Sequence, residues 1–168
     1  YTQITGFLEG QYLTVNGKGD PVLVLQAQKK ITPKIGWFAL ALNSQSWSQA
    51  YVGPSYFPTD WLEVGAGYGL ETADESGRFG SYAFLSDGES ASLLIAYEDG
   101  GSGPWHKIVL NYKINQFGVG FMDQSLVGFG PRAEFRTGKF TAWAAVLVRD
   151  NEDGEQKSNQ VLGLTYNF

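Results

Sequence analysis

The sequence of 168 residues contains no cysteine, a single histidine and a single methionine. Without thiols the chain forms neither a disulfide framework nor a thiolate metal site, and one histidine by itself argues against a transition-metal site. We therefore expect no metal and no cofactor. Lysine and arginine number 12 against 17 aspartate and glutamate residues, so no basic excess is available to neutralise the phosphates of a nucleic acid.

Long apolar segments are also missing. No run of about 18 apolar residues occurs, which excludes a membrane-spanning helix. No segment has the pattern of a secretory signal peptide, and if the protein is exported we expect that peptide to have been removed already. The modest length predicts one domain over residues 1–168.

What the sequence does contain is an alternation of apolar and polar residues, with helical spacing nowhere sustained for about ten residues. This pattern predicts an all-β protein. The clearest strand covers residues 61–71, where one face carries Leu62, Val64, Ala66, Tyr68 and Leu70 and the other carries only glycine and glutamate. Residues 107–113, 127–136 and 23–30 alternate in a similar way.

The last strand is the most informative segment. Leu162, Leu164, Tyr166 and Phe168 share one face, and nothing after them in the sequence covers it. In water this face would be exposed apolar surface, whereas in a bilayer it matches the solvent of a barrel wall. The ending resembles the C-terminal signal of bacterial outer-membrane barrel proteins. The resemblance implies a location in the bacterial outer membrane, contact with lipid and lipopolysaccharide, and recognition by the barrel-assembly machinery through this strand.

Alternation alone also fits a soluble lipocalin-like barrel that binds an apolar ligand, in which the apolar face points inward. Two features favour the membrane barrel. Glycine is concentrated on the polar face, at Gly65, Gly67 and Gly69, where a soluble barrel needs solubilising side chains. Aromatic residues gather near strand ends, as at Trp61 and Trp105, which is typical of the girdles at membrane interfaces.

The connections between strands give the third argument. Those at one end are generally longer, acidic and glycine-rich, whereas those at the other end are generally tighter, as in outer-membrane barrels with short periplasmic turns. The first group is 16–20, 43–48, 72–78, 98–103, 123–125 and 149–158, and the second is 31–34, 58–60, 86–89, 114–116 and 137–139.

This spacing predicts an antiparallel up-and-down transmembrane β-barrel of about twelve strands. Ten strands remain the alternative, because Pro54 and Pro131 lie within strand candidates and each implies a bulge or an early strand end. Closely spaced turn signals such as Asp87-Gly88 and Asp99-Gly100 disfavour eight strands.

The predicted wall assigns every side chain to a face. The lipid-facing set is Leu62, Val64, Tyr68, Leu70, Ile108, Leu110, Tyr112, Leu162, Leu164, Tyr166 and Phe168. The channel-lining set is Glu9, Gln26, Gln28, Glu63, Glu71, Glu98, Lys107, Lys113, Arg132, Glu134, Arg136 and Arg149. About eight strands leave an interior filled by side chains and sixteen or more leave a wide channel, so twelve predict a narrow pore with mixed charges. Glycines on this face, among them Gly118 and Gly128, favour open space in the lumen.

These features resemble the small bacterial outer-membrane channels of about ten to fourteen strands, such as those for acidic sugars or nucleosides. The resemblance implies passive diffusion of a small polar or charged solute. It departs from acidic-sugar channels in one respect, because both signs of charge occur on the lumen face. The charges can instead pair across the interior and plug it, so a plugged structural barrel stays an alternative.

An enzyme is the rival class, since some outer-membrane barrels are hydrolases or acyltransferases that use serine with histidine. His106 lies beside Trp105 on the face shared by Ile108, and Ser92 or Ser102 are candidate partners. A single histidine beside a tryptophan is more typical of an aromatic girdle, and we expect no enzyme. The acidic segment 150–155 is a calcium candidate, but a solvated loop facing lipopolysaccharide explains it better.

Overall fold

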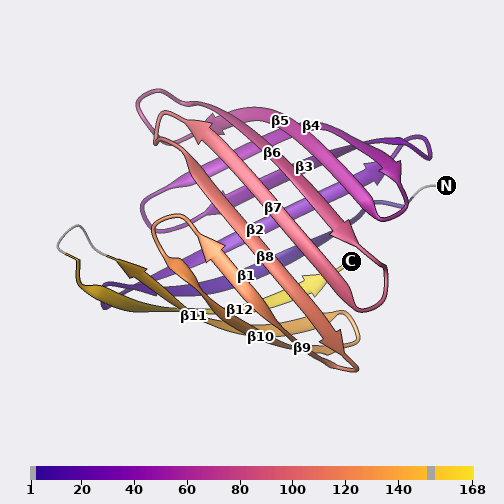
Figure 1. Cartoon of the computed structure of the whole chain (residues 1–168). Coiled ribbons are helices and arrows are strands. Elements are labelled where there is room, and N and C mark those ends of the chain that lie inside the picture. Colours follow the sequence, from indigo (N-terminus) through magenta and orange to yellow (C-terminus); the bar gives the residue numbers. More distant parts are fainter. Residues whose placement is uncertain (1–2, 151–153) are drawn as a thin grey trace.

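The computed structural model describes residues 3–150 and 154–168, and part of the calcium candidate at 150–155 lies outside them. These residues form an all-β closed barrel of twelve strands in which each strand pairs antiparallel with its neighbours in sequence (Figure 1). The strands are β1 (Thr5–Val15), β2 (Lys18–Lys30), β3 (Ile35–Asn43), β4 (Ser48–Thr59), β5 (Leu62–Glu71), β6 (Gly77–Ser86), β7 (Ala91–Gly100), β8 (Trp105–Ile114), β9 (Phe117–Gln124), β10 (Gly128–Thr137), β11 (Phe140–Asp150) and β12 (Gln156–Asn167). The predicted up-and-down barrel of about twelve strands is confirmed.

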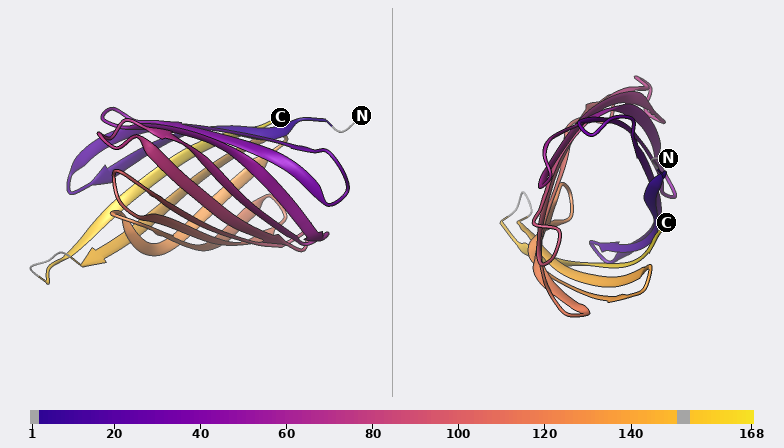
Figure 2. Two further views of the ribbon diagram at one scale, coloured as in Figure 1. Left: turned by 90° about the horizontal axis from the view of Figure 1, so that it is seen from above. Right: turned by 90° about the vertical axis from the view of Figure 1, so that its right-hand side faces the viewer.

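Closure of the barrel depends on the pairing of the first and last strands. β12 pairs with β11 along its length and with β1 from Phe7↔Asn167 to Thr14↔Gln160. The strand that ends in the aromatic residues is therefore no free edge, because both of its ladders are satisfied. β1 begins and β12 ends at the same end of the barrel (Figure 2).

The two-residue period assigns alternate side chains to the two faces of this wall. Large apolar side chains stay exposed on the outside, such as Tyr68 at 65% and Phe117 at 62%, whereas Leu147 and Val161 in the interior have no exposed surface. Every residue of the predicted lipid-facing set lies on the outer face, with Leu62 and Val64 half-buried there. The barrel is thus apolar toward its surroundings, the arrangement that suits a bilayer.

The prolines behave differently from the prediction of a bulge or an early strand end at each. Pro54 stays in register opposite Trp37, and Pro131 stays in register opposite Phe121. Each interrupts pairing only with the other neighbouring strand, because proline has no N–H to donate. For Pro54 this is the pairing of β4 with β5. For Pro131 it is the pairing of β10 with β11, whose register is the same on both sides of the proline. The one register shift of β4 with β5 lies between Tyr56 and Thr59.

The connections define two ends, called here the loop side, where β1 joins β2, and the turn side, where β2 joins β3. The difference in length between them is smaller than predicted. The connection expected over 16–20 is only the pair Asn16-Gly17, both with positive φ (52° and 76°), which is the geometry of a tight hairpin turn. Strands β1 and β2 extend over the rest of that segment because its backbone groups continue the ladder up to Val15↔Lys18.

Placing a charge on the middle of the outer wall tests the membrane environment. We expect Leu162→Arg to lower the free energy of unfolding from lipid vesicles by about 2–4 kcal/mol, the cost of an arginine at the bilayer midplane. Ser158→Arg, on the same face but near the loop-side end of β12, is the matched control and costs about 0–1 kcal/mol. Denaturant titration in vesicles measures both, and equal stability of the two variants would contradict a lipid-facing wall.

Candidate solute pathway in the barrel interior

The turn-side half of the barrel encloses a charged cavity of about 770 Å³. Its lining alternates along β8 and β10, where every second residue points inward. Six charged side chains line it: Glu9, Lys107, Lys113, Arg132, Glu134 and Arg136. All six belong to the predicted channel-lining set, and the fold brings them together from three strands.

Glu134 is the carboxylate most completely surrounded by donors in this cavity. Arg132 Nη1 lies 2.5 Å from Glu134 Oε2, and Arg136 forms an ion pair with the other carboxylate oxygen. Asn111 Nδ2 donates to the same carboxylate at 2.9 Å. Because Glu134 stands between the two arginines on β10, its negative charge is offset locally.

Glu9 on β1 is held in a similar way. Trp143 Nε1 donates to it at 2.9 Å, and the Thr165 hydroxyl and the Gln11 amide also donate to its carboxylate. Lys107 and Arg132 both lie over the Trp143 ring, with the Arg132 guanidinium carbon 4.7 Å from its centre. The cavity therefore holds four cationic side chains against two engaged carboxylates.

On the loop side, by contrast, ion pairs occupy the interior. Arg78 is 1% exposed, and its guanidinium contacts Glu71 at 3.1 Å and Glu98 at 3.0 Å. Tyr51 donates to Glu98 at 3.0 Å, and Trp47 Nε1 donates to Glu71 at 2.9 Å. Glu71 and Glu98 were predicted to line the channel, and the structure places both in this buried network.

An interior apolar cluster fills another part of the loop-side half. It consists of Leu13, Val22, Val24, Met122, Val127, Trp143, Ala145, Leu147 and Val161. Sequence reasoning missed this cluster, although one signal was present: Val22 and Val24 alternate with Leu23 and Leu25, so that both faces of β2 are apolar there.

Glycines in the wall make room for aromatic side chains. A Cβ on Gly65 would lie 2.3 Å from the Tyr82 ring, and one on Gly163 would lie 2.2 Å from the Trp143 ring. The predicted link between lumen glycines and open space is therefore wrong at Gly65, because the Tyr82 ring packs directly against its bare backbone. Phe38 contacts the rings of both Tyr51 and Tyr82 edge-on, which extends this packed region.

The other predicted lining residues have separate surroundings. Gln26 donates to Gln28 at 3.1 Å, Glu63 accepts from the Tyr82 hydroxyl at 2.5 Å, and Arg149 donates to the Leu126 carbonyl at the rim at 2.9 Å. Arg78 was missed because it was placed in a connection, although it precedes the alternating Gly80 and Tyr82.

His106 lies on the outer face, away from both serines proposed as its partners. Ser92 lines the interior cavity, and the Ser102 hydroxyl donates to Glu71. Both are separated from His106 because inward and outward side chains alternate along the strands.

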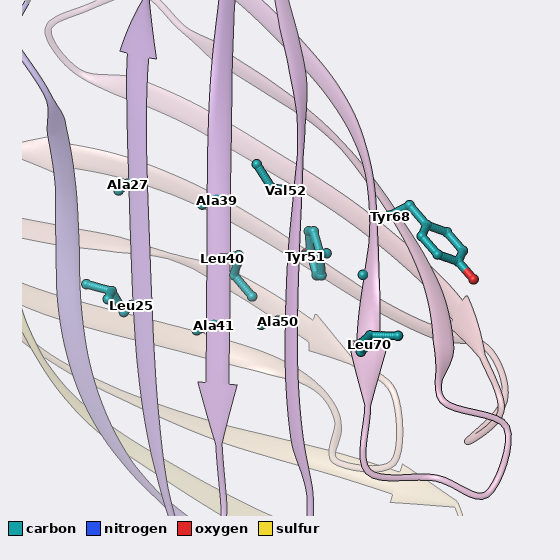
Figure 3. A pocket seen from close by; sticks show the side chains of 11 residues that line it. Leu25, Ala27, Ala39, Leu40, Ala41, Ala50, Tyr51, Val52, Tyr68 and Leu70 are labelled. Carbon is teal, nitrogen blue, oxygen red and sulfur yellow. The ribbon is translucent and has the colours of Figure 1, made fainter.

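The outer wall carries one shallow groove of about 450 Å³ over β2 to β5 (Figure 3). Its floor is formed largely by small side chains, Ala27, Ala39, Ala41 and Ala50, between Leu25 and Leu70. An apolar hollow on the outer face of the wall contributes nothing to a path for polar solutes.

The fold defines the structural class, a closed antiparallel β-barrel of twelve strands, and solved porin structures share it. The KdgM porin is similar to this chain with a TM-score of 0.60 and 12% sequence identity over 98% of this chain and 99% of the other. The NanC porin is similar with a TM-score of 0.61 and 12% identity over 97% and 100% of the two chains. A KdgM porin in complex with disordered oligogalacturonate matches at the same TM-score and identity as the first. No family model and no curated protein sequence matches the chain.

Removing the cation of the loop-side network tests its role in stability. We expect Arg78→Met to lower the free energy of unfolding by about 3–5 kcal/mol, because it leaves Glu71 and Glu98 buried without their partner. The control is Arg136→Met, whose side chain is 39% exposed and whose partner Glu134 keeps Arg132; it costs below about 1 kcal/mol. Denaturant unfolding in detergent micelles compares the two, and a small loss for Arg78→Met would show that the network is dispensable.

Proposed function

We propose that the protein is a channel of the bacterial outer membrane for the passive diffusion of small polar or charged solutes. The observation that carries this proposal is the cavity of about 770 Å³, lined by six charged side chains, inside an apolar outer wall. Structural likeness to the KdgM and NanC porins supports it at the level of the fold. A pocket of this kind is unsuited to an apolar ligand.

Buried polar atoms in the interior support a hydrated lumen. Among the described residues, Gln49 Oε1, Asn111 Oδ1 and Gln124 Oε1 are buried without a hydrogen-bond partner in the protein. Buried polar groups are normally satisfied by protein or by ordered water. Water along the interior would supply the missing donors.

The charges of the cavity favour anionic solutes. Glu9 and Glu134 are engaged by donors on several sides, whereas four lysines and arginines surround the same space. Rings of cationic side chains select anions in pores. These four cations support the proposal that the turn side of the mixed-charge lumen is a basic vestibule, the name used below for this cavity.

The orientation and partners follow from the ends of the strands. We place the turn side toward the periplasm and the loop side toward lipopolysaccharide, as in other barrels with both termini at the periplasmic end. In this orientation a solute passes the loop-side packing before it reaches the vestibule. The last strand, β12, would serve as the contact for the assembly machinery.

A plugged structural barrel is the second candidate, and one observation favours it. Leu147 and Val161 have no exposed surface and Arg78 is 1% exposed, so packed side chains occupy much of the loop-side interior. If this packing is permanent, the vestibule is closed at one end. If it is the constriction of the channel, it sets the size of the solute.

Single-channel recording in a planar bilayer distinguishes the two candidates. We expect discrete conductance steps from the wild-type protein, and a reversal potential in a salt gradient that shows preference for anions. Lys107→Gln combined with Lys113→Gln removes two cations from the vestibule and shifts this preference toward cations. Lys29→Gln, on the outer face of β2, is the control and leaves the reversal potential unchanged. A folded, heat-modifiable barrel without conductance would contradict the channel.

Trimming the interior apolar cluster locates the constriction. We expect Leu147→Ala with Val161→Ala to raise the single-channel conductance, because both side chains point into the loop-side interior and fill it. Leu162→Ala, on the outer face beside Val161, is the matched control and leaves conductance as in the wild type. The same conductance in the double variant and the control would place the constriction elsewhere.

A further inference from the structure

A serine, a histidine and an aspartate meet on the outer face of the barrel, at the loop side. Ser125 Oγ lies 2.8 Å from His106 Nδ1, and His106 Nε2 lies 3.1 Å from Asp123 Oδ2. From these contacts we propose a second function: Ser125, His106 and Asp123 form a catalytic triad that hydrolyses carboxylic esters with apolar acyl chains at the membrane interface.

The register of the β8–β9 hairpin creates this arrangement. Ile108 pairs with Asp123 and Lys107 with Gln124, which sets His106 opposite Ser125. Asp123 and Ser125 are two residues apart, so the period of a strand directs both side chains to the same face. Ser125 was missed as a partner of His106 because the pairing of the strands, and not the spacing in the sequence, joins them.

The hydrogen bonds around His106 are compatible with the proton positions that such a triad needs. In the proposed triad, neutral His106 carries its hydrogen on Nε2, because an ionised carboxylate such as that of Asp123 only accepts hydrogen bonds. The lone pair on Nδ1 then accepts a hydrogen bond from the Ser125 hydroxyl. The backbone N–H of His106 donates to Ser125 Oγ at 2.8 Å, which holds the oxygen in place while its hydrogen points at the imidazole. A nucleophile, a base and an orienting acid are therefore in contact.

The chain around Ser125 presents the hydroxyl outward. Leu126, the next residue, has a φ of 70°, a left-handed conformation that is rare for a residue other than glycine. Such outliers gather at functional sites. The Arg149 guanidinium donates to the Leu126 carbonyl at 2.9 Å, which fixes the turn that follows Ser125.

The neighbouring surface suits an acyl chain. Tyr97 pairs with His106 across β7 and β8, and Phe129 pairs with Asp123 across β9 and β10. Both are exposed on the outer face, as is Leu126 at 67%. The His106 side chain is itself 46% exposed, so an ester can reach the histidine and serine while its acyl chain lies against the apolar wall.

The proposed hydrolysis requires only the ester, water and the three side chains. Ser125 Oγ bonds to the ester carbonyl carbon as its proton moves to His106 Nδ1, and the alcohol leaves with that proton. Water then attacks the acyl-serine while His106 takes its proton. The carboxylic acid departs and the proton returns to Ser125. The site lies on the outer face, separate from the lumen, so hydrolysis and conductance succeed or fail independently.

Labelling with a fluorophosphonate and turnover of 4-nitrophenyl butyrate, both in detergent micelles, test the proposal. We expect the folded wild type to be labelled on Ser125, as mass spectrometry of its peptides would show. Ester turnover should fall at least about 100-fold in Ser125→Ala and in His106→Gln, the scale of a lost general base. Asp123→Asn should also lower turnover, since the amide no longer enforces the histidine tautomer.

Ser81→Ala is the matched control, because Ser81 lies on the outer face of β6 and bonds only the Tyr97 carbonyl, at 3.4 Å. It should keep the wild-type turnover. Heat-modifiable migration in electrophoresis verifies that each variant folds, and if Ser125→Ala does not fold, the site of labelling in the wild type decides. Absence of labelling, labelling at another residue, or unchanged turnover in folded Ser125→Ala would overturn the triad.

Discussion

Backbone hydrogen bonding is the constraint on which this structure depends. In hydrocarbon, an unpaired backbone N–H or C=O cannot form a hydrogen bond with water. A β-sheet is therefore stable there only if it has no free edges. The pairing of β1 with β12 supplies this closure, from Phe7↔Asn167 to Thr14↔Gln160. Once the ladder closes, the pleat assigns each side chain to the outer surface or to the interior.

The interior of the barrel has a loop-side part, where inward side chains pair or pack with one another, and a turn-side part, where they line a cavity. Arg78 with Glu71 and Glu98 forms a buried network on the loop side, and Leu147 and Val161 belong to a separate apolar cluster and have no exposed surface. On the turn side, cations outnumber carboxylates around an open volume. Glycines allow this dense packing, since Trp143 lies against the bare backbone of Gly163. A barrel of twelve strands is thus wide enough for a cavity and narrow enough to be partly filled by its own residues.

The two faces of the wall can therefore carry separate chemistry. The lumen carries a cavity lined by charged side chains, whereas the loop-side rim at β8 and β9 carries a polar cluster next to exposed apolar side chains. Neither site shares a side chain with the other, apart from the common scaffold of β8. Alternation along a strand permits this, because the side chains of neighbouring residues such as His106 and Lys107 point to opposite faces of the wall.

Sequence alone determined the fold class and predicted about twelve strands, with ten as the alternative, because a period of two is a local property that short segments such as 62–71 display. It also indicated which charges turn inward. What only the tertiary structure decided is how these side chains meet. Arg78 reaches carboxylates on β5 and β7, aromatic rings fill the space left by glycines, and His106 joins Ser125. These contacts arise from register and from the curvature of a closed wall, which join residues far apart in the chain and leave no periodic trace in it.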